Sequence, residues 1–194
     1  MPPRSRLTVA AEPKRQALVL AAYRQLAERG FEGLRTREIA GAVGVNIATL
    51  HYYFPSKEDL VRGVVEHAMG RFRSTLSGAA SPAKMLRAHF DGIRRLAREE
   101  PEVFAVMGEL VLRARRDDAI AKIMKETDAV WHSTLRTLLR RAQADGDVDR
   151  ALDPGDTAAV IVATLKGAYV LPAGGAEHAA RTLRQLERWL ELSG

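Results

Sequence analysis

Apolar residues recur along this chain at intervals of three and four residues, the spacing that places side chains on one face of an α-helix. Strand-like alternation is nearly absent, and the single β-branched cluster, residues 160–162, lies in an alanine-rich helical context. The pattern therefore predicts an all-α protein. Nine helices are expected, at about residues 13–29, 37–43, 47–53, 56–76, 82–98, 101–115, 118–144, 154–171 and 176–192.

Residues that end or start helices mark the borders of the first four segments. Gly30 follows the first segment, at the position where a left-handed residue closes a helix. Thr36, Asn46 and Ser56 have short polar side chains that cap helix N-termini, and each stands at the start of a predicted helix. Gly44 separates the second helix from the third, which leaves two short helices joined by a tight turn.

The segment from Thr36 to Tyr53 meets the demands of a helix-turn-helix. Two short helices cross steeply in that motif, so the first needs a small residue at the crossing and the turn needs a residue that tolerates positive φ. Ala40 and Gly44 meet these demands. An ordinary antiparallel helix pair is the alternative, but the second helix is short for such a pair. The shared core of the two helices is expected to contain Ile39, Val43, Val45, Leu50 and Tyr53.

The charge of the chain favours an anionic partner. The formal net charge is +6 and the isoelectric point is near 10.0. Residues 1–57 hold nine Lys or Arg and only four Asp or Glu, so most of the excess lies in less than a third of the 194 residues. Nucleic acid is the commonest partner of such a basic region, although arginine-rich proteins that bind none also exist.

Composition also excludes several classes of protein. The chain has no cysteine, which removes disulfides, thiolate catalysis and cysteine metal sites. No apolar run approaches the length of a transmembrane span, so no membrane partner is expected. The first 13 residues lack the apolar stretch of a secretory signal, and we expect a cytoplasmic protein.

An ordered series of motifs from about Lys14 to Leu60 resembles the DNA-binding region of the TetR family of repressors. The matching residues are Leu20-Ala21-Ala22, Glu28-Arg29-Gly30-Phe31, Thr36-Arg37-Glu38-Ile39-Ala40, Val43-Gly44-Val45, Thr49-Leu50 and Tyr53-Phe54-Pro55-Ser56-Lys57-Glu58-Asp59-Leu60. Residues 1–12, with two prolines and two arginines, are expected to form a flexible arm. The resemblance implies a helix-turn-helix DNA-binding domain at 13–57 and a helical domain at 58–194 that senses a ligand and dimerises.

By this resemblance the chain is a bacterial transcriptional repressor that binds a palindromic or pseudopalindromic operator as a homodimer. The helix after Asn46 would enter the major groove, and residues on either side of it would contact phosphates. The side chain of Asn46 caps its own helix or reads a base. His51 stands where the family commonly has a tyrosine, and a histidine can also donate to DNA. The predicted DNA-binding residues are Thr36, Arg37, Asn46, Ile47, Ala48, Thr49, His51, Tyr52, Tyr53 and Lys57.

The remaining helices are expected to form an effector site and a dimer surface. The resemblance implies a small, largely apolar effector that releases the DNA, and no cofactor or metal. Each residue of these two sets has ordinary core packing as its alternative role. The predicted effector residues are Met85, His89, Phe90, Phe104, Met107, Leu110, Met124, Trp131, His132, Leu135 and Tyr169. The predicted dimer residues are Ala159, Val162, Ala163, Gly167, Leu183, Leu186, Trp189 and Leu190.

Two other functions stay open from the sequence. An enzyme is the first, but the five histidines form no metal motif, and neither a phosphate-binding glycine loop nor a nucleophile elbow is present. His89 and His132 lie on different predicted helices, and packing of those helices could bring the two histidines together. The second alternative is a DNA-binding protein without a small-molecule ligand.

Overall fold

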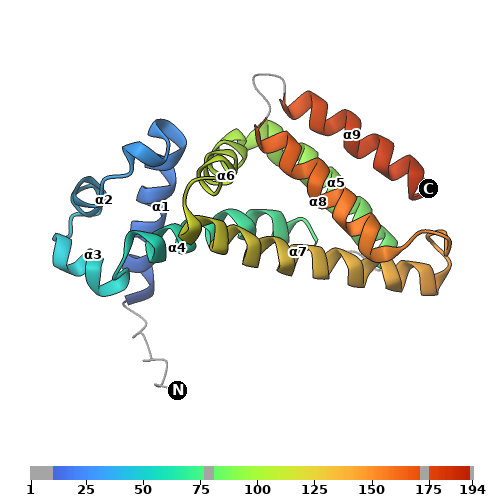
Figure 1. Ribbon diagram of the computed structural model, residues 1–194, viewed down its shortest axis with the longest axis horizontal. Coiled ribbons are helices and arrows are strands. Elements are labelled where there is room, and N and C mark those ends of the chain that lie inside the picture. Colours follow the sequence, from blue (N-terminus) through green and yellow to red (C-terminus); the bar gives the residue numbers. More distant parts are fainter. Residues whose placement is uncertain (1–10, 77–80, 171–174, 193–194) are drawn as a thin grey trace, which may run out of the picture. The chain divides into compact units, whose positions relative to one another are not determined.

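The computed structural model describes residues 11–76, 81–170 and 175–192 (Figure 1). These residues form nine α-helices, one short 3-10 helix and no strand, so the predicted fold class is confirmed. The predicted arm lies almost entirely outside the described residues. The helices are α1 (Ala11–Arg29), η1 (Phe31–Gly33), α2 (Thr36–Val43), α3 (Ile47–Tyr53), α4 (Lys57–Ser74), α5 (Pro82–Glu99), α6 (Pro101–Arg113), α7 (Asp118–Asp145), α8 (Pro154–Val170) and α9 (Gly175–Trp189).

The chain divides into two compact units. Unit 1 is Met1–His67 and unit 2 is Ala68–Gly194, so the division falls inside α4. The sequence predicted that the DNA-binding domain ends at residue 57. That limit describes which residues bind DNA and not how the chain packs, so it stays a prediction.

Unit 1 is built around one apolar stripe of α1. Leu18 and Leu26 are almost completely buried on this stripe, and α1 packs against η1 and α2. Phe31 ends the stripe by turning its buried ring back after Gly30. Full burial of one such side chain stabilises a fold by about 1.5–3 kcal/mol, so the stripe holds α2, a helix too short to persist alone, and α2 packs in turn against α3.

The start of α2 corrects one prediction. Arg35, and not Thr36, is the N-cap residue, with an extended backbone and no side-chain cap. The physical reason is a tether: the Arg35 amide donates to Gln25 Oε1 at 2.6 Å, and the Arg35 carbonyl accepts from the Ile39 amide at 3.0 Å. Thr36 is therefore the first residue of the helix.

The predicted cap of α4 is confirmed. Ser56 Oγ accepts from the Asp59 amide at 3.0 Å, and the Asp59 carboxylate accepts from the Ser56 amide at 3.1 Å. This reciprocal arrangement satisfies two backbone donors that the first turn of a helix leaves free.

Unit 2 is a bundle in which α5 packs against α6, α7 and α9, while α8 packs against α6, α7 and α9 (Figure 1). Its core consists of apolar side chains at helical spacing, such as Leu86, Phe90 and Ile93 of α5. Arg94 of α5 forms an ion pair with Glu187 of α9 at 2.9 Å, with both side chains largely buried. Across the described ranges, no helix is long and apolar enough to cross a membrane.

Candidate nucleic-acid interface and sensing site

The turn between α2 and α3 has the geometry that the sequence predicted. Gly44 adopts φ 71° and ψ 29°, a left-handed conformation, and its amide reaches the carbonyls of Ala40 and Gly41. Asn46 caps α3 with its side chain. Ile39, Ala40 and Leu50 are buried between the helices, whereas Val43, Val45 and Tyr53 are half-buried. The helix-turn-helix is therefore present.

Replacing Gly44 by alanine should lower the free energy of unfolding by about 1 kcal/mol, because a Cβ disfavours the left-handed conformation. Gly41 provides a matched control, since it lies within α2 and an added Cβ would meet nothing within 4 Å. Gly41→Ala should instead raise stability by about 0.5–1 kcal/mol, because glycine weakens a helix interior. Urea denaturation of both variants checks the two signs. A Gly44→Ala variant with the same free energy of unfolding as the parent would contradict the left-handed turn geometry.

All ten predicted DNA-binding residues are accessible in unit 1. Arg37, Asn46, Ala48, His51 and Tyr52 are exposed, and Thr36, Ile47, Thr49, Tyr53 and Lys57 are half-buried. Tyr52 has 74% of its surface exposed, which is unusual for a large aromatic side chain. These side chains of α2, α3 and the start of α4 are therefore open to a partner.

The basic residues of unit 1 differ in how far they are engaged within the protein. Glu38 accepts hydrogen bonds from Gln25 at 3.1 Å and from Arg29 at 2.7 Å, so Arg29 helps to fix α2 on α1. Lys57 lies over the Phe31 ring, 4.2 Å from its centroid, at the first turn of α4. Arg37 is exposed with no partner among the described residues, which leaves its guanidinium available to an anion.

The cap of α3 fixes the orientation of the Asn46 amide. Asn46 Oδ1 accepts from both the Thr49 amide, at 2.8 Å, and the Thr49 hydroxyl, at 2.9 Å. A backbone N–H can only donate, so the oxygen faces the helix. No described residue accepts from Asn46 Nδ2. The exposed side chain therefore presents two N–H donors at the N-terminal end of α3.

The predicted effector residues mostly lie in the core of unit 2. His89, Phe90, Met107, Leu110, Met124, Trp131 and Leu135 are buried, and Met85, Phe104 and His132 are half-buried. The side chain of Tyr169 lies outside the described residues. The rings of His89 and Trp131 meet edge to face, with centroids 6.1 Å apart, so α5 and α7 bring two of the predicted residues together.

Phe72 and Thr75, which the sequence analysis missed, complete this group. The Phe72 ring contacts Phe104, with centroids 5.7 Å apart, and Trp131, with centroids 5.5 Å apart. Thr75 Oγ1 lies 2.5 Å from His89 Nδ1. Both residues keep the three-to-four-residue spacing of the buried face of α4, and this spacing is the sequence signal that could have identified them. We call these five residues, His89, Trp131, Phe72, Phe104 and Thr75, the aromatic cluster.

Gly92 allows the close approach of Thr75 to α5. A Cβ on Gly92 would lie 2.4 Å from the Thr75 Cβ, a distance that atoms do not tolerate. Gly92 stands three residues after His89, on the same face of α5. The glycine therefore lets the end of α4 reach the histidine.

His89 is a neutral histidine with one unused nitrogen. It is completely buried, and burial lowers the pKa of its imidazole from 6.5 to about 4. His89 Nε2 and Trp131 Nε1 are both buried without a hydrogen-bond partner. A buried polar group left unpaired costs about 1–3 kcal/mol, so each such group in a folded protein calls for an explanation.

His132 lies in a different environment. Its Nε2 is 2.9 Å from the Gly155 carbonyl, and its side chain lines a groove of about 340 Å³ between α7 and α8. The proposed meeting of His89 with His132 therefore finds no contact in support, and the described residues hold no cluster of three potential metal ligands. The groove is lined by Asp128, Ala129, His132, Ala159, Val162, Ala163 and Lys166.

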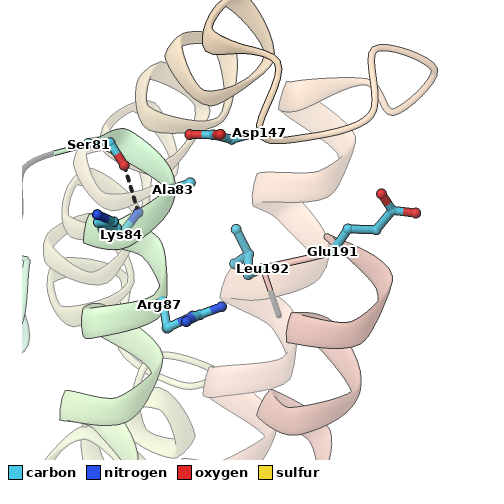
Figure 2. A pocket seen from close by; sticks show the side chains of 7 residues that line it. All are labelled: Ser81, Ala83, Lys84, Arg87, Asp147, Glu191 and Leu192. Atoms are coloured by element: carbon cyan, nitrogen blue, oxygen red, sulfur yellow. Dashed lines mark hydrogen bonds between the residues drawn. The ribbon is translucent and has the colours of Figure 1, made fainter. Parts of the chain in front are cut away.

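A second groove, of about 290 Å³, lies near the start of α5 (Figure 2). Lys84 and Arg87 contribute positive charge to it, and Asp147 and Glu191 contribute negative charge. Figure 2 shows Arg87 and Leu192 pointing toward its middle, whereas the Glu191 carboxylate points away. It contains none of the predicted effector residues, and its mixed charge does not suit an apolar ligand.

The predicted dimer residues divide into two groups. Val162, Leu183, Leu186 and Leu190 are buried in unit 2. The three leucines of α9 therefore do not belong to an exposed surface of the single chain. Ala159, Ala163, Gly167 and Trp189 are accessible, and Val160 and Val170 extend the same exposed side of α8.

Comparison with known proteins matches both parts of the chain to regulators. Residues 18–64 match the family described as "Bacterial regulatory proteins, tetR family". Residues 82–192 match the family described as "BetI-type transcriptional repressor, C-terminal". The HTH-type transcriptional regulator BetI of Rhizobium meliloti is 29% identical over 147 residues, which cover 73% of this chain and 72% of that protein. The HTH-type transcriptional dual regulator CecR of Shigella flexneri is 33% identical over 124 residues, covering 64% of this chain and 50% of CecR.

Solved structures give the same result for the fold. A putative TetR-family transcriptional regulator from Rhodococcus sp. superposes with a TM-score of 0.81 at 26% identity, covering 92% of this chain and 98% of the other. A putative transcriptional regulator from Saccharomonospora viridis, crystallised in complex with choline, superposes with a TM-score of 0.69 at 22% identity, covering 91% of this chain and 96% of the other.

Proposed function

This chain belongs to the TetR family of bacterial DNA-binding transcriptional regulators, and we propose that it is a dimeric repressor released from its operator by a small organic effector. Regulators of this family are not enzymes, which removes the enzymatic alternative. A repressor acts on the chromosome, so we place the chain in the bacterial cytoplasm.

The DNA-binding part of this proposal rests on one observation, which is the accessibility of the side chains of α3. Ile47 and Ala48 supply apolar contacts that suit thymine methyl groups, and Tyr52 projects from the same helix. Arg37 and Lys57 flank this surface and suit phosphates, which fix the register of the helix without reading sequence.

Asn46 adds a specific base contact in this proposal. Its oxygen is used by the cap of α3, so it cannot form the bidentate contact to adenine that requires both an acceptor and a donor. Its two free N–H groups suit acceptors, of which guanine presents two, O6 and N7, in the major groove. We therefore expect Asn46 to face a guanine or another base acceptor at the edge of each half-site.

The exposed side of α8 supports the proposed homodimer. Ala159, Ala163 and Gly167 have small side chains that let a second helix approach closely, and the groove between α7 and α8 borders them. Trp189 of α9 has 63% of its surface exposed. An exposed tryptophan and an adjoining apolar helix side are typical of a protein interface. Two copies joined here would present two α3 helices to half-sites about 34–36 Å apart.

Ala163→Glu should convert the dimer to a monomer, because a carboxylate placed against its symmetry mate is both desolvated and repelled. The dimer dissociation constant should rise by about a hundredfold or more. Ala144→Glu is the matched control, since Ala144 is exposed on α7 outside this surface. Sedimentation velocity distinguishes the two variants, and an Ala163→Glu protein that still sediments as a dimer would place the interface elsewhere.

The effector is proposed to act through α4. This helix begins at Lys57, a proposed phosphate contact, and ends at Ser74, next to the Thr75 that contacts His89. An effector that binds the DNA-incompetent state more tightly would shift the population away from the operator. Operator binding by the purified chain, measured with and without the effector, tests this mechanism. Unchanged DNA affinity at saturating effector would refute the sensing part alone.

A further inference from the structure

The unpaired polar atoms of the aromatic cluster carry an inference about the chemistry of the effector. It rests on the proposed function, because it concerns the sensing site of that regulator. The relevant atoms are His89 Nε2 and Trp131 Nε1, the unpaired nitrogens of two rings whose centroids are 6.1 Å apart.

The hydrogen bonds of Thr75 decide which nitrogen of His89 carries the proton. Thr75 Oγ1 donates its only proton to the Phe72 carbonyl, at 2.6 Å. It must therefore accept from His89, so the hydrogen lies on Nδ1. A neutral imidazole has only one N–H, which leaves Nε2 as a bare acceptor.

Trp131 offers the opposite property. An indole nitrogen is a donor only, and the Trp131 N–H is buried without a partner. The cluster therefore presents one unused acceptor and one unused donor on neighbouring rings. The remaining surface is aromatic, from Phe72 and Phe104, and Phe104 is only half-buried.

We propose that the effector is a neutral, mainly apolar molecule whose hydroxyl group donates to His89 Nε2 and accepts from Trp131 Nε1. A carboxylate has no proton for Nε2, and an ammonium group has no lone pair for the indole. An aliphatic or aromatic body packs against Phe72 and Phe104. A hydroxyl is the smallest group that satisfies both nitrogens at once.

Three ring compounds of nearly equal size test this assignment: benzyl alcohol, toluene and benzoate. The protein is the full chain carrying Trp189→Phe, which leaves Trp131 as its only tryptophan and makes indole fluorescence a local reporter. Benzyl alcohol should bind about tenfold more tightly than toluene, because it restores two hydrogen bonds, and benzoate should bind more weakly than either. Equal affinities for benzyl alcohol and toluene, or no binding of benzyl alcohol at millimolar concentration, would overturn the proposal.

Substitution of His89 tests whether this residue causes the preference for benzyl alcohol over toluene. His89→Phe in the same background should reduce the preference for the alcohol from about tenfold to about threefold, because only the hydrogen bond from Trp131 remains. His67→Phe is the matched control and should keep the preference, since His67 lies in unit 1, where its ring contacts Tyr23. If His89→Phe does not fold, the proton position in the unsubstituted protein still decides the matter. Nitrogen-15 NMR should find the proton of His89 on Nδ1, and a proton on Nε2 would overturn the proposal.

Operator binding by the unsubstituted chain separates this inference from the function on which it depends. A chain that binds a selected operator but fails the alcohol test loses only the effector assignment, and a regulator without this ligand chemistry remains. A chain that binds no operator loses the proposed function itself, whatever the ring compounds do.

Discussion

Asn46→Asp should weaken operator binding by about a hundredfold while leaving unit 1 folded. Aspartate caps a helix as well as asparagine does, so the Thr49 amide keeps its acceptor. The two N–H donors that face outward are lost, and a negative charge appears at the end of α3 that approaches the DNA. Each good base contact is worth about 1–3 kcal/mol, and a dimer makes it twice.

Asn46→Ser is the matched variant, because serine also caps the helix but brings no charge. It should lose about thirtyfold in affinity and should relax the base preference at one position of each half-site. Fluorescence anisotropy with a labelled operator measures both variants, and circular dichroism checks that each remains helical. Full affinity in Asn46→Asp would show that the side chain only caps α3.

The chain should lose about 3 kcal/mol of stability through His89 between pH 7 and pH 4. The pKa of His89 is about 4 in the folded protein and 6.5 in the unfolded chain. Between these values the unfolded chain binds the proton and the folded protein does not, so acid favours unfolding. The contribution is fully present above pH 6.5 and is lost as the pH falls through about 4.

His89→Gln isolates this contribution, because carboxylates also titrate in the lower part of the range. The Asp153 carboxylate, for example, accepts hydrogen bonds from the amides of Asp156 and Gly155, which lowers its pKa. Urea denaturation of both proteins at several pH values should give a flatter stability curve for His89→Gln than for the parent. Two parallel curves would mean that His89 is not held neutral by burial.

The sequence predicted unit 1 well because its borders are set by local chemistry. Gly44 requires a left-handed backbone, and Asn46 bonds an amide three residues away, so both effects are visible in a short stretch of sequence. The misplaced cap at Thr36 has a non-local cause. Arg35 is held by Gln25 of α1, and no pattern within α2 indicates that hydrogen bond.

The helices of unit 2 and three members of its aromatic cluster were predicted, but their contacts were not, because helical periodicity shows that a side chain is apolar without showing what it contacts. Leu183, Leu186 and Leu190 have the spacing of a dimer surface, yet they pack inside their own chain. Phe72 and Thr75 were missed although they keep the helical spacing of α4. Their contacts with Trp131 and His89 depend on how three helices pack, and Gly92 permits that packing.

The central claim is that α3 reads a DNA sequence, and selection of binding sites from a random duplex library tests it most directly. The purified chain should enrich one motif with two related half-sites centred about 34–36 Å apart. The same selection with Asn46→Ser should change one base position in each half-site and preserve the spacing. Failure to enrich any sequence at low ionic strength, or an identical motif from a chain whose α3 surface residues are all alanine, would contradict the claim.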